Sequence, residues 1–291
     1  MTNRRIFIKQ LTAASVASSI PFMPDAKNEI EKSSIRLLVR GDDMGKNYGR
    51  TVGFMKSHKE GILTSASIMA TSVYFDESVR FCKENPALAA GVHITILDGT
   101  QRPVLSPEKV PSLVTPKGFF YENSEELLQR NAREEEMEME MRAQIEKARH
   151  SGLHFVYLDW HRGVFPAAQQ MIAKLCKEEK LILGHSNDGY VYGYKLTGMV
   201  RGEKFPSQVL PDGQTAFYSA PESTAEEQQS FFDALNDLKP GRWLTVCHPG
   251  WADPNRASTT KLLCSPKTKE IIKRKNIQLV SYKDIWEEEY G

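Results

Sequence analysis

The chain has 291 residues, an apolar fraction of 40% and a charged fraction of 26%, which is ordinary for a soluble globular protein. Its net charge of +1 gives no electrostatic basis for binding nucleic acid or an acidic membrane surface, so we expect neither as a partner. The length is within the range of a single α/β barrel.

The first residues have the order of an export signal. Arg4 and Arg5 form a twin-arginine pair ahead of a weakly apolar run over residues 11–20. A membrane-spanning helix needs about 20 apolar residues, so we expect no stable membrane insertion here or elsewhere. We expect residues 1–26 to be a twin-arginine export signal to the periplasm and residues 27–34 to be a linker. The alternative is a disordered basic tail or a packed amphipathic helix on a cytoplasmic protein.

From residue 35 onward, β-rich and helical segments alternate along the chain. Strands are expected at residues 35–39, 63–70, 91–96, 155–158, 243–247 and 277–282. Helices are expected at residues 51–59, 76–85, 124–149, 166–180, 224–238 and 267–275. Two stretches rich in Gly and in Pro or Tyr, residues 98–121 and 184–221, are expected to be long loops that shape a pocket. The alternation predicts one domain over residues 35–291 with a (β/α) barrel-like α/β fold.

An acidic run and the cysteines have plain structural interpretations. The run from Glu134 to Met141 predicts a solvent-exposed acidic face with methionines packing inward. The cysteines are widely spaced, without a C-x-x-C pair, so we expect free thiols and no required disulfide: Cys82, Cys176, Cys247 and Cys264.

Several expected strands end in an aspartate or a histidine. Asp42 and Asp43 follow the first strand, His93 lies in the third, and His161 and His248 follow two later ones. The carboxyl ends of parallel strands meet at one rim of a barrel, so these side chains are expected to share a site there. A carboxylate and two imidazoles suit zinc or another first-row metal and leave positions for water and substrate.

The Asp pair needs special geometry to act together. Adjacent residues on a regular strand point to opposite faces, but at a loop entry both Asp42 and Asp43 can turn toward one pocket. One could then bind a divalent metal while the other takes a proton from water. The alternatives are that Asp43 merely caps a helix and that His93 is a hydrogen-bonded core residue.

The order of these motifs resembles the YdjC-like carbohydrate deacetylases, which include chitooligosaccharide deacetylases. The likeness covers nearly everything from Ile35 to Tyr282. It is carried by Gly41-Asp42-Asp43-Met44-Gly45 (A-D-D-F-G in the family), Gly61-Ile62-Leu63-Thr64-Ser65 followed by Met69, Gly91-Val92-His93-Ile94-Thr95, Leu158-Asp159-Trp160-His161, and Cys247-His248-Pro249-Gly250.

The resemblance implies a (β/α) barrel-like fold, one divalent metal ion, and removal of an acetyl group from an N-acetylated sugar or oligosaccharide. Carried over by motif, Asp43, His93 and His161 would hold the metal. Asp42 would be the general base that activates water. His248 would protonate the leaving amine or stabilise the oxyanion. The identity of the metal, among zinc, magnesium and other first-row ions, stays open.

The chain also departs from the family pattern. The family often has D-S-H-x-H at the third motif, where this chain has Trp160 for the serine and Gly163 for the second histidine. Arg256 follows H-P-G as in the family, but Lys261 stands where a glutamate is usual. We expect Trp160, Trp251 and Arg256 to contact substrate, and core or rim packing is the alternative for the tryptophans.

Two other functions are also compatible with the sequence. The altered motifs are compatible with a catalytically degenerate carbohydrate-binding protein. The same rim could also serve a metal hydrolase that acts on another ester, amide or phosphate substrate. In every case a small carbohydrate or similar molecule is the expected partner, and a homodimer is the open question about assembly.

Overall fold

The computed structural model describes residues 34–184, 225–253 and 256–291, together with five short strands between residues 190 and 217. The expected export signal, the linker up to residue 33 and most of the 184–221 segment lie outside the described residues. Among the helices that are described, none is long and apolar enough to cross a membrane.

The central element is β1 (Ile35–Met44), a fully buried strand in a parallel sheet. On one side it pairs with β11 (Gly241–Cys247); on the other, its first half pairs with β12 (Ile277–Val280) and its second half with β2 (Ser65–Ile68). The remaining neighbours in the sheet are β3 (Ala89–Ile94), β4 (Phe155–Trp160) and β5 (Ile182–Leu183) beyond β2, and β8 (Gly198–Met199) beyond β11. This half-barrel arrangement confirms the expected barrel-like α/β fold.

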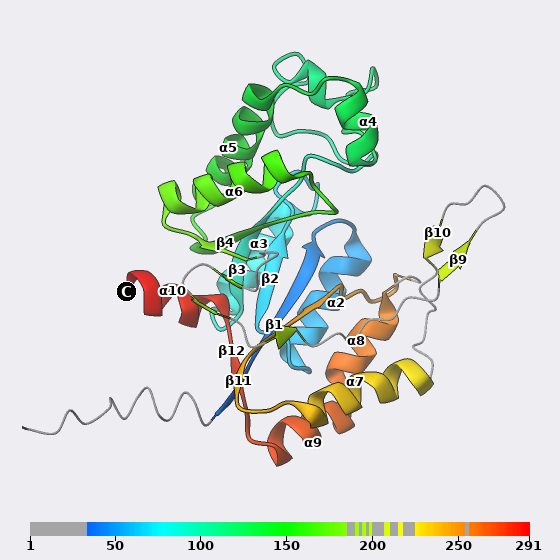
Figure 1. The fold of residues 1–291 in the computed structure, drawn as a ribbon, viewed down its shortest axis with the longest axis vertical. Coiled ribbons are helices and arrows are strands. Elements are labelled where there is room, and N and C mark those ends of the chain that lie inside the picture. The colour runs from blue at the N-terminus through cyan, green and yellow to red at the C-terminus, as the bar shows by residue number, and fades with distance from the viewer. Residues whose placement is uncertain are drawn as a thin grey trace, which may run out of the picture.

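Helices cover the sheet between successive strands, as Figure 1 shows. On the side of β3 and β4 lie α5 (Glu134–His150) and α6 (Pro166–Glu179), and α10 (Tyr282–Tyr290) packs against β3, β4 and β5. The others are α2 (Tyr48–Lys59), α3 (Phe75–Glu84), α4 (Ser124–Gln129), α7 (Ala225–Asp237), α8 (Ala257–Cys264) and α9 (Pro266–Arg274). Two more pairs of short strands, β6 (Tyr190–Val191) with β7 (Tyr194–Lys195) and β9 (Ser207–Val209) with β10 (Thr215–Phe217), are antiparallel.

The observed helices differ from the predictions in three places. The helix expected over residues 124–149 is divided into α4 and α5 by a turn in which Asn131 has a φ of 53°. Helix α8 was not expected. Tyr282 begins α10 instead of ending a strand, because Ser281 and Asp284 form a capping box at its amino end.

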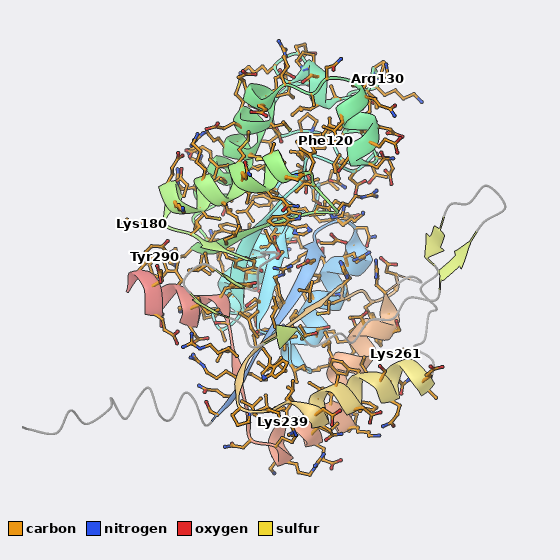
Figure 2. The ribbon with its side chains drawn as sticks, viewed as in Figure 1. Phe120, Arg130, Lys180, Lys239, Lys261 and Tyr290 are labelled. Atoms are coloured by element: carbon orange, nitrogen blue, oxygen red, sulfur yellow. The ribbon has the colours of Figure 1, made fainter. Side chains whose placement is uncertain are left out.

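The Pro-rich segment after β3 is a folded loop held by helix α5. The buried carboxylate of Glu140 accepts hydrogen bonds from the backbone N–H groups of Val104 and Leu105, at 2.8 and 3.0 Å. Glu136 does the same for Ser112. Phe120, labelled in Figure 2, is fully buried in this loop. The acidic run is therefore only partly a solvated face.

The predicted burial of the methionines was confirmed only in part, whereas the prediction for the cysteines was confirmed. Met137 and Met141 are buried as expected, whereas Met139 is 46% exposed. All the cysteines are free, as expected: Cys82, Cys176 and Cys247 are buried and Cys264 is half-buried.

Candidate active site

The Asp pair lies at the carboxyl end of β1 but inside the strand, not at a loop entry as expected. The pairing of β1 with β2 shifts register between Gly41 and Met44. Within this bulge Asp43 has a φ of 75°, a left-handed conformation that Asp tolerates better than most residues. The bulge interrupts the strict alternation of the strand, so both carboxylates line the same cavity.

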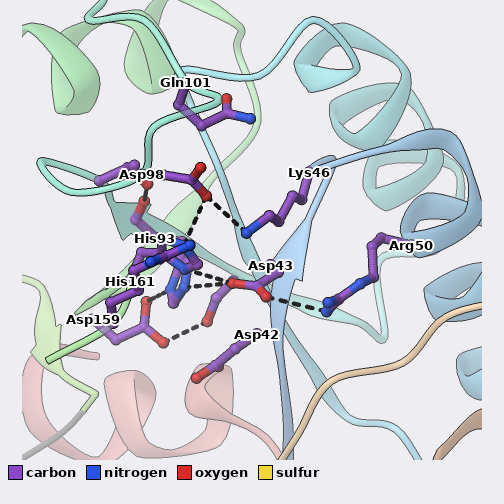
Figure 3. A network of polar contacts seen from close by, with 12 residues as sticks. Asp42, Asp43, Lys46, Arg50, His93, Asp98, Gln101, Asp159 and His161 are labelled. Carbon is purple, nitrogen blue, oxygen red and sulfur yellow. Dashed lines mark hydrogen bonds and ion pairs between the residues drawn. The ribbon is translucent and has the colours of Figure 1, made fainter. Parts of the chain in front are cut away.

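Asp43, His93 and His161 converge at this point, as the sequence predicted. Oδ1 of Asp43 lies 3.2 Å from Nε2 of His93 and 2.7 Å from Nδ1 of His161 (Figure 3). All three side chains are buried, and one ligand atom from each lies within 4.8 Å of the others. A carboxylate oxygen and two imidazole nitrogens at this spacing could hold a divalent metal ion.

The far nitrogen of each histidine contacts a buried carboxylate that sequence reasoning missed. Nδ1 of His93 donates to Oδ1 of Asp159 at 2.8 Å, and Nε2 of His161 donates to Oδ2 of Asp98 at 3.0 Å (Figure 3). Such contacts fix the tautomer and the orientation of metal-binding histidines. Asp159 lies beside His93 because β3 and β4 pair in this register, and its place two residues before His161 was the available sequence signal.

The carboxylate of Asp42 accepts hydrogen bonds from a buried arginine. Arg40 donates to both carboxylate oxygens of Asp42, at 2.7 and 3.0 Å, and its Nε also lies 3.1 Å from Oδ2 of Asp159. A second group of potential ligands, Asp42, His93 and Asp159, lies close together. Because the guanidinium already sits against both of these carboxylates, a cation is better placed among Asp43, His93 and His161.

Arg40 is itself held in place by Gly184 and by Tyr282, which lies near the carboxyl end of the chain. Its Nη1 donates to the carbonyl of Gly184 and lies 3.3 Å from the hydroxyl of Tyr282. The Tyr282 hydroxyl also donates to Gly184, at 2.6 Å, and its ring stacks on Tyr157 with centroids 4.0 Å apart. The floor of the site therefore depends on the first residue of α10.

A second arginine ties Asp43 to the loop after β11. Arg50 lies 3.1 Å from Oδ2 of Asp43 and 3.0 Å from Oδ2 of Asp253. Helix α2 can approach this loop because Gly53 and Gly250 pack directly together: a Cβ on Gly53 would lie 2.3 Å from Cα of Gly250. The two glycines thus bring the segment that carries His248 next to the Asp pair.

Buried carboxylates crowd the inner site. They are those of Asp42, Asp43, Asp98, Asp159 and Asp253. Arg40, Lys46 and Arg50 form ion pairs with them. A bound cation would be favoured in such surroundings.

Protons would compete with a metal ion for the side chains of this site. Burial opposes the charged form of His93, yet the carboxylates of Asp159 and Asp43 raise its pKa to about 10. Burial would likewise raise the pKa of Asp43, but His161 and His93 hold that pKa well below its ordinary value. For Asp42, burial raises the pKa in spite of Arg40, which favours a carboxylate able to accept a proton.

A cavity of about 550 Å³ lies over these groups. Of the residues predicted from sequence, it is lined by Asp42, Asp43, His93, His161, His248, Trp160 and Arg256. Trp251 is not among the lining residues; its ring packs 4.9 Å from Nζ of Lys56 on α2. The part of Trp251 in substrate binding therefore stays a prediction.

Two departures from the family pattern have different surroundings. Gly163, which lines the cavity, has open space where a Cβ would be, so the missing histidine leaves room beside His161. Lys261 projects from α8 at the surface (Figure 2). It is not among the lining residues of the cavity.

The sequence of this chain is similar to those of known proteins. The family model described as "YdjC-like protein" matches residues 36–274. A carbohydrate deacetylase of Brevibacillus brevis is 27% identical over 264 residues, covering 86% of this chain and 100% of that protein. One from Enterococcus faecalis is 26% identical over 267 residues, covering 87% and 99%.

A solved structure supports the fold. It is that of an Enterococcus faecalis protein named for cellobiose-phosphate cleavage. The two structures superpose with a TM-score of 0.69 at 24% sequence identity, covering 87% of this chain and 99% of that one. This likeness bears on the arrangement of helices and strands.

Proposed function

Because the chain belongs to the YdjC-like protein family, we propose that it is a metal-dependent carbohydrate deacetylase that removes the acetyl group from an N-acetylated sugar. The single observation that carries this proposal is the buried cluster of Asp43, His93 and His161 beneath an open polar cavity. The deacetylase names of similar proteins from Brevibacillus brevis and Enterococcus faecalis support it.

The donor set supports one divalent metal ion. Asp43, His93 and His161 would supply three ligands, and three protein ligands leave positions for water and substrate, as in catalytic zinc sites. A bound divalent ion would supply Lewis-acid chemistry, lowering the pKa of water and polarising the acetyl carbonyl. Asp159 and Asp98 hold the two imidazoles in the orientation that this requires.

The residues around this centre can carry the proton transfers of amide hydrolysis. Asp42 takes a proton from the water that attacks the carbonyl carbon, and Arg40 holds its carboxylate in place. His248, which also lines the cavity, gives a proton to the sugar nitrogen as the C–N bond breaks. The products are acetate and the free amino sugar.

One preparation of the purified protein tests the proposal. We would measure metal content by elemental analysis and then acetate release from a panel of N-acetylated sugars, with and without a chelator. Acetate release that the chelator abolishes and zinc restores is the expected result. Bound metal without acetate would favour another ester, amide or phosphate substrate. Sugar binding without metal or acetate would favour a degenerate carbohydrate-binding protein.

The location of the protein is a separate proposal. The order of Arg4, Arg5 and the apolar run after them supports export by a twin-arginine route. Fractionation of cells that express the full chain, compared with an Arg4→Lys/Arg5→Lys variant, tests it. We expect the variant to stay in the cytoplasm.

A further inference from the structure

The proton transfers proposed above do not use one buried arginine of the cavity. Arg50, on α2, lines the cavity and is 6% exposed. Its Nη1 lies 3.1 Å from Oδ2 of Asp43 (Figure 3), and its Nε lies 3.0 Å from Oδ2 of Asp253. A guanidinium that contacts two buried carboxylates through separate nitrogens is held in one orientation. Arg50 is therefore suited to fix the positions of the groups around it.

The two carboxylate oxygens of Asp43 have different neighbours. Oδ1 lies 3.2 Å from Nε2 of His93 and 2.7 Å from Nδ1 of His161, whereas Oδ2 faces Arg50. Because Oδ2 already contacts the guanidinium, a cation between the histidines would meet Oδ1 alone. A carboxylate that gives one oxygen to a metal leaves more positions for water and substrate than one that gives both.

The second carboxylate that Arg50 contacts belongs to the loop after β11, which carries His248. Oδ2 of Asp253 also accepts from the side-chain amide of Asn47, at 3.2 Å. Asn47 in turn caps the amino end of α2 by accepting from the backbone N–H of Arg50, at 2.8 Å. The loop is thus joined, through one guanidinium, to the carboxylate of Asp43.

Two roles for Arg50 predict opposite effects on metal affinity. If it only neutralises buried charge so that the site can form, its loss should disturb Asp43 and weaken metal binding. If it restricts Asp43 to one oxygen, its loss removes a positive charge that repels the metal and frees Oδ2 to bind, so metal binding should become tighter. In the second case the cost should fall on turnover.

We propose that Arg50 is a positioning residue for the reaction. It restricts Asp43 to one oxygen toward the metal and, through Asp253, it holds the loop of His248 beside the cavity. This rests on the proposed function for the reaction and its metal, but it makes a separate claim about how Arg50 trades metal affinity for turnover.

The first test compares two substitutions of Arg50 by calorimetric zinc titration, by the visible absorption of the cobalt-loaded protein and by kcat and KM for acetate release. We expect Arg50→Gln to bind zinc about tenfold more tightly, because a repelling charge is gone. Its cobalt spectrum should change, since Asp43 can offer a second oxygen. Its kcat should fall by about 10- to 100-fold with little change in KM.

Arg50→Lys keeps the positive charge but not the planar fork that reaches two carboxylates. It should therefore retain the zinc affinity of the wild type and still lose kcat. Arg142→Gln is the matched control, because Arg142 pairs with Glu138 and Glu178 on the outer side of α5 and α6. It should change neither zinc affinity nor kcat.

The second test concerns the loop and uses Asp253→Asn, which leaves Arg50 and Asp43 unchanged. The backbone N–H of Trp251 donates to the carbonyl of Gly49 at 2.7 Å, so its hydrogen exchange reports how firmly the loop is attached to α2. Exchange at Trp251 should accelerate in Asp253→Asn and in Arg50→Gln more than exchange in β1 does. In Asp253→Asn, kcat should fall while zinc affinity stays close to that of the wild type.

The outcomes separate this proposal from the proposed function. Acetate release with the same kcat in all variants would overturn the role of Arg50 and leave the deacetylase intact. Tighter zinc binding in Arg50→Gln and faster exchange at Trp251, without acetate release by the wild type, would support the role and overturn the deacetylase. Weaker zinc binding in folded Arg50→Gln would overturn the role. If Arg50→Gln does not fold, unchanged kcat in Arg50→Lys or unchanged exchange in Asp253→Asn would overturn it, and a loss of kcat with faster exchange would support it. A wild-type protein that binds neither zinc nor cobalt would overturn both proposals.

Discussion

Asp159 accepts a hydrogen bond from Nδ1 of His93 at 2.8 Å, on the side of the imidazole that faces away from Asp43. Asp98 has the same relation to His161, with a distance of 3.0 Å. Each of the two histidines proposed as metal ligands is therefore oriented by a buried carboxylate, and both carboxylates should matter to the metal as well as to the reaction.

The first prediction concerns these carboxylates. Asp159→Asn and Asp98→Asn should each weaken zinc binding by about 10- to 100-fold, because an amide no longer fixes the tautomer of the histidine beside it. Calorimetric titration of the metal-free protein with zinc measures this. Glu138→Gln, at an acidic residue on α5 whose carboxylate pairs with Arg142 and Lys174, is the control. Wild-type affinity in both aspartate variants would contradict the assignment.

The second prediction separates the roles of the proposed base and a proposed ligand. Asp42→Asn should retain bound zinc but lose about 10²- to 10⁴-fold in kcat, because an amide cannot accept the proton from water. His93→Ala should lose the metal itself. Elemental analysis and acetate release are measured on the same samples. Equal, full activity in both variants would remove the basis for these roles.

The third prediction concerns Arg40, whose guanidinium contacts both Asp42 and Asp159. Arg40→Met should lower the free energy of unfolding by about 3–5 kcal/mol, since it leaves two buried carboxylates without their cation. Arg149→Met is the control: Arg149 pairs with Glu146 and Glu179 at the surface, so its loss should cost at most about 1 kcal/mol. Urea unfolding of both variants with zinc removed tests this, and equal losses would contradict it.

The fourth prediction concerns pH in the absence of metal. The carboxylates around His93 raise its pKa to about 10, against about 6.5 in an unfolded chain. Its protonated form therefore stabilises the metal-free fold fully below about pH 6.5, and this contribution is lost as the pH rises toward 10. With a chelator present, the free energy of unfolding should fall between pH 7 and pH 9. The fall should be smaller in His93→Gln.

Protons and zinc should also compete for the imidazole of His93 when the metal binds. Zinc needs the neutral imidazole, so binding at pH 7 should release protons, and the apparent affinity should increase with pH. Titrations in two buffers with different ionisation enthalpies count the protons released. A binding enthalpy that is the same in both buffers would show that His93 is already neutral.

The fifth prediction concerns the loop after β3. Glu140→Ala should cost about 2–4 kcal/mol of stability, because the backbone N–H groups of Val104 and Leu105 lose their buried acceptor. Amide hydrogen exchange at these two residues should accelerate more than exchange in β1. Glu138→Ala on the outer face of α5 should cost less than about 1 kcal/mol. Unchanged exchange at Val104 and Leu105 would show that the loop does not depend on Glu140.

The sequence was sufficient to predict those site residues whose positions follow from the order of the strands alone. The carboxyl ends of parallel strands meet at one edge, so Asp43, His93 and His161 could be placed together without coordinates. The prediction that the Asp pair lies at a loop entry was wrong. A bulge inside β1 instead directs both carboxylates into the cavity. A bulge depends on how two strands pair, and a single strand does not reveal it.

The supporting residues were harder to predict because their roles depend on distances between atoms. Asp98 lies in a loop whose path is set by Glu140 and Gln144 on a helix some forty residues later. Arg40 looked like an ordinary strand residue, yet its partner Tyr282 comes from the far end of the chain. Such pairings come from tertiary packing, which local sequence pattern does not encode.

The contact between Arg40 and Tyr282 also orders events during synthesis of the protein. These residues are 242 positions apart, and β1 must wait for β11 and β12 before both of its sides are paired. At roughly 5–20 residues per second, a ribosome takes on the order of 10–50 s to cover that distance. A nascent chain thus carries its Asp pair long before it has Tyr282, and Arg40 can reach its final contacts beneath the site only after the first residue of α10 has been made.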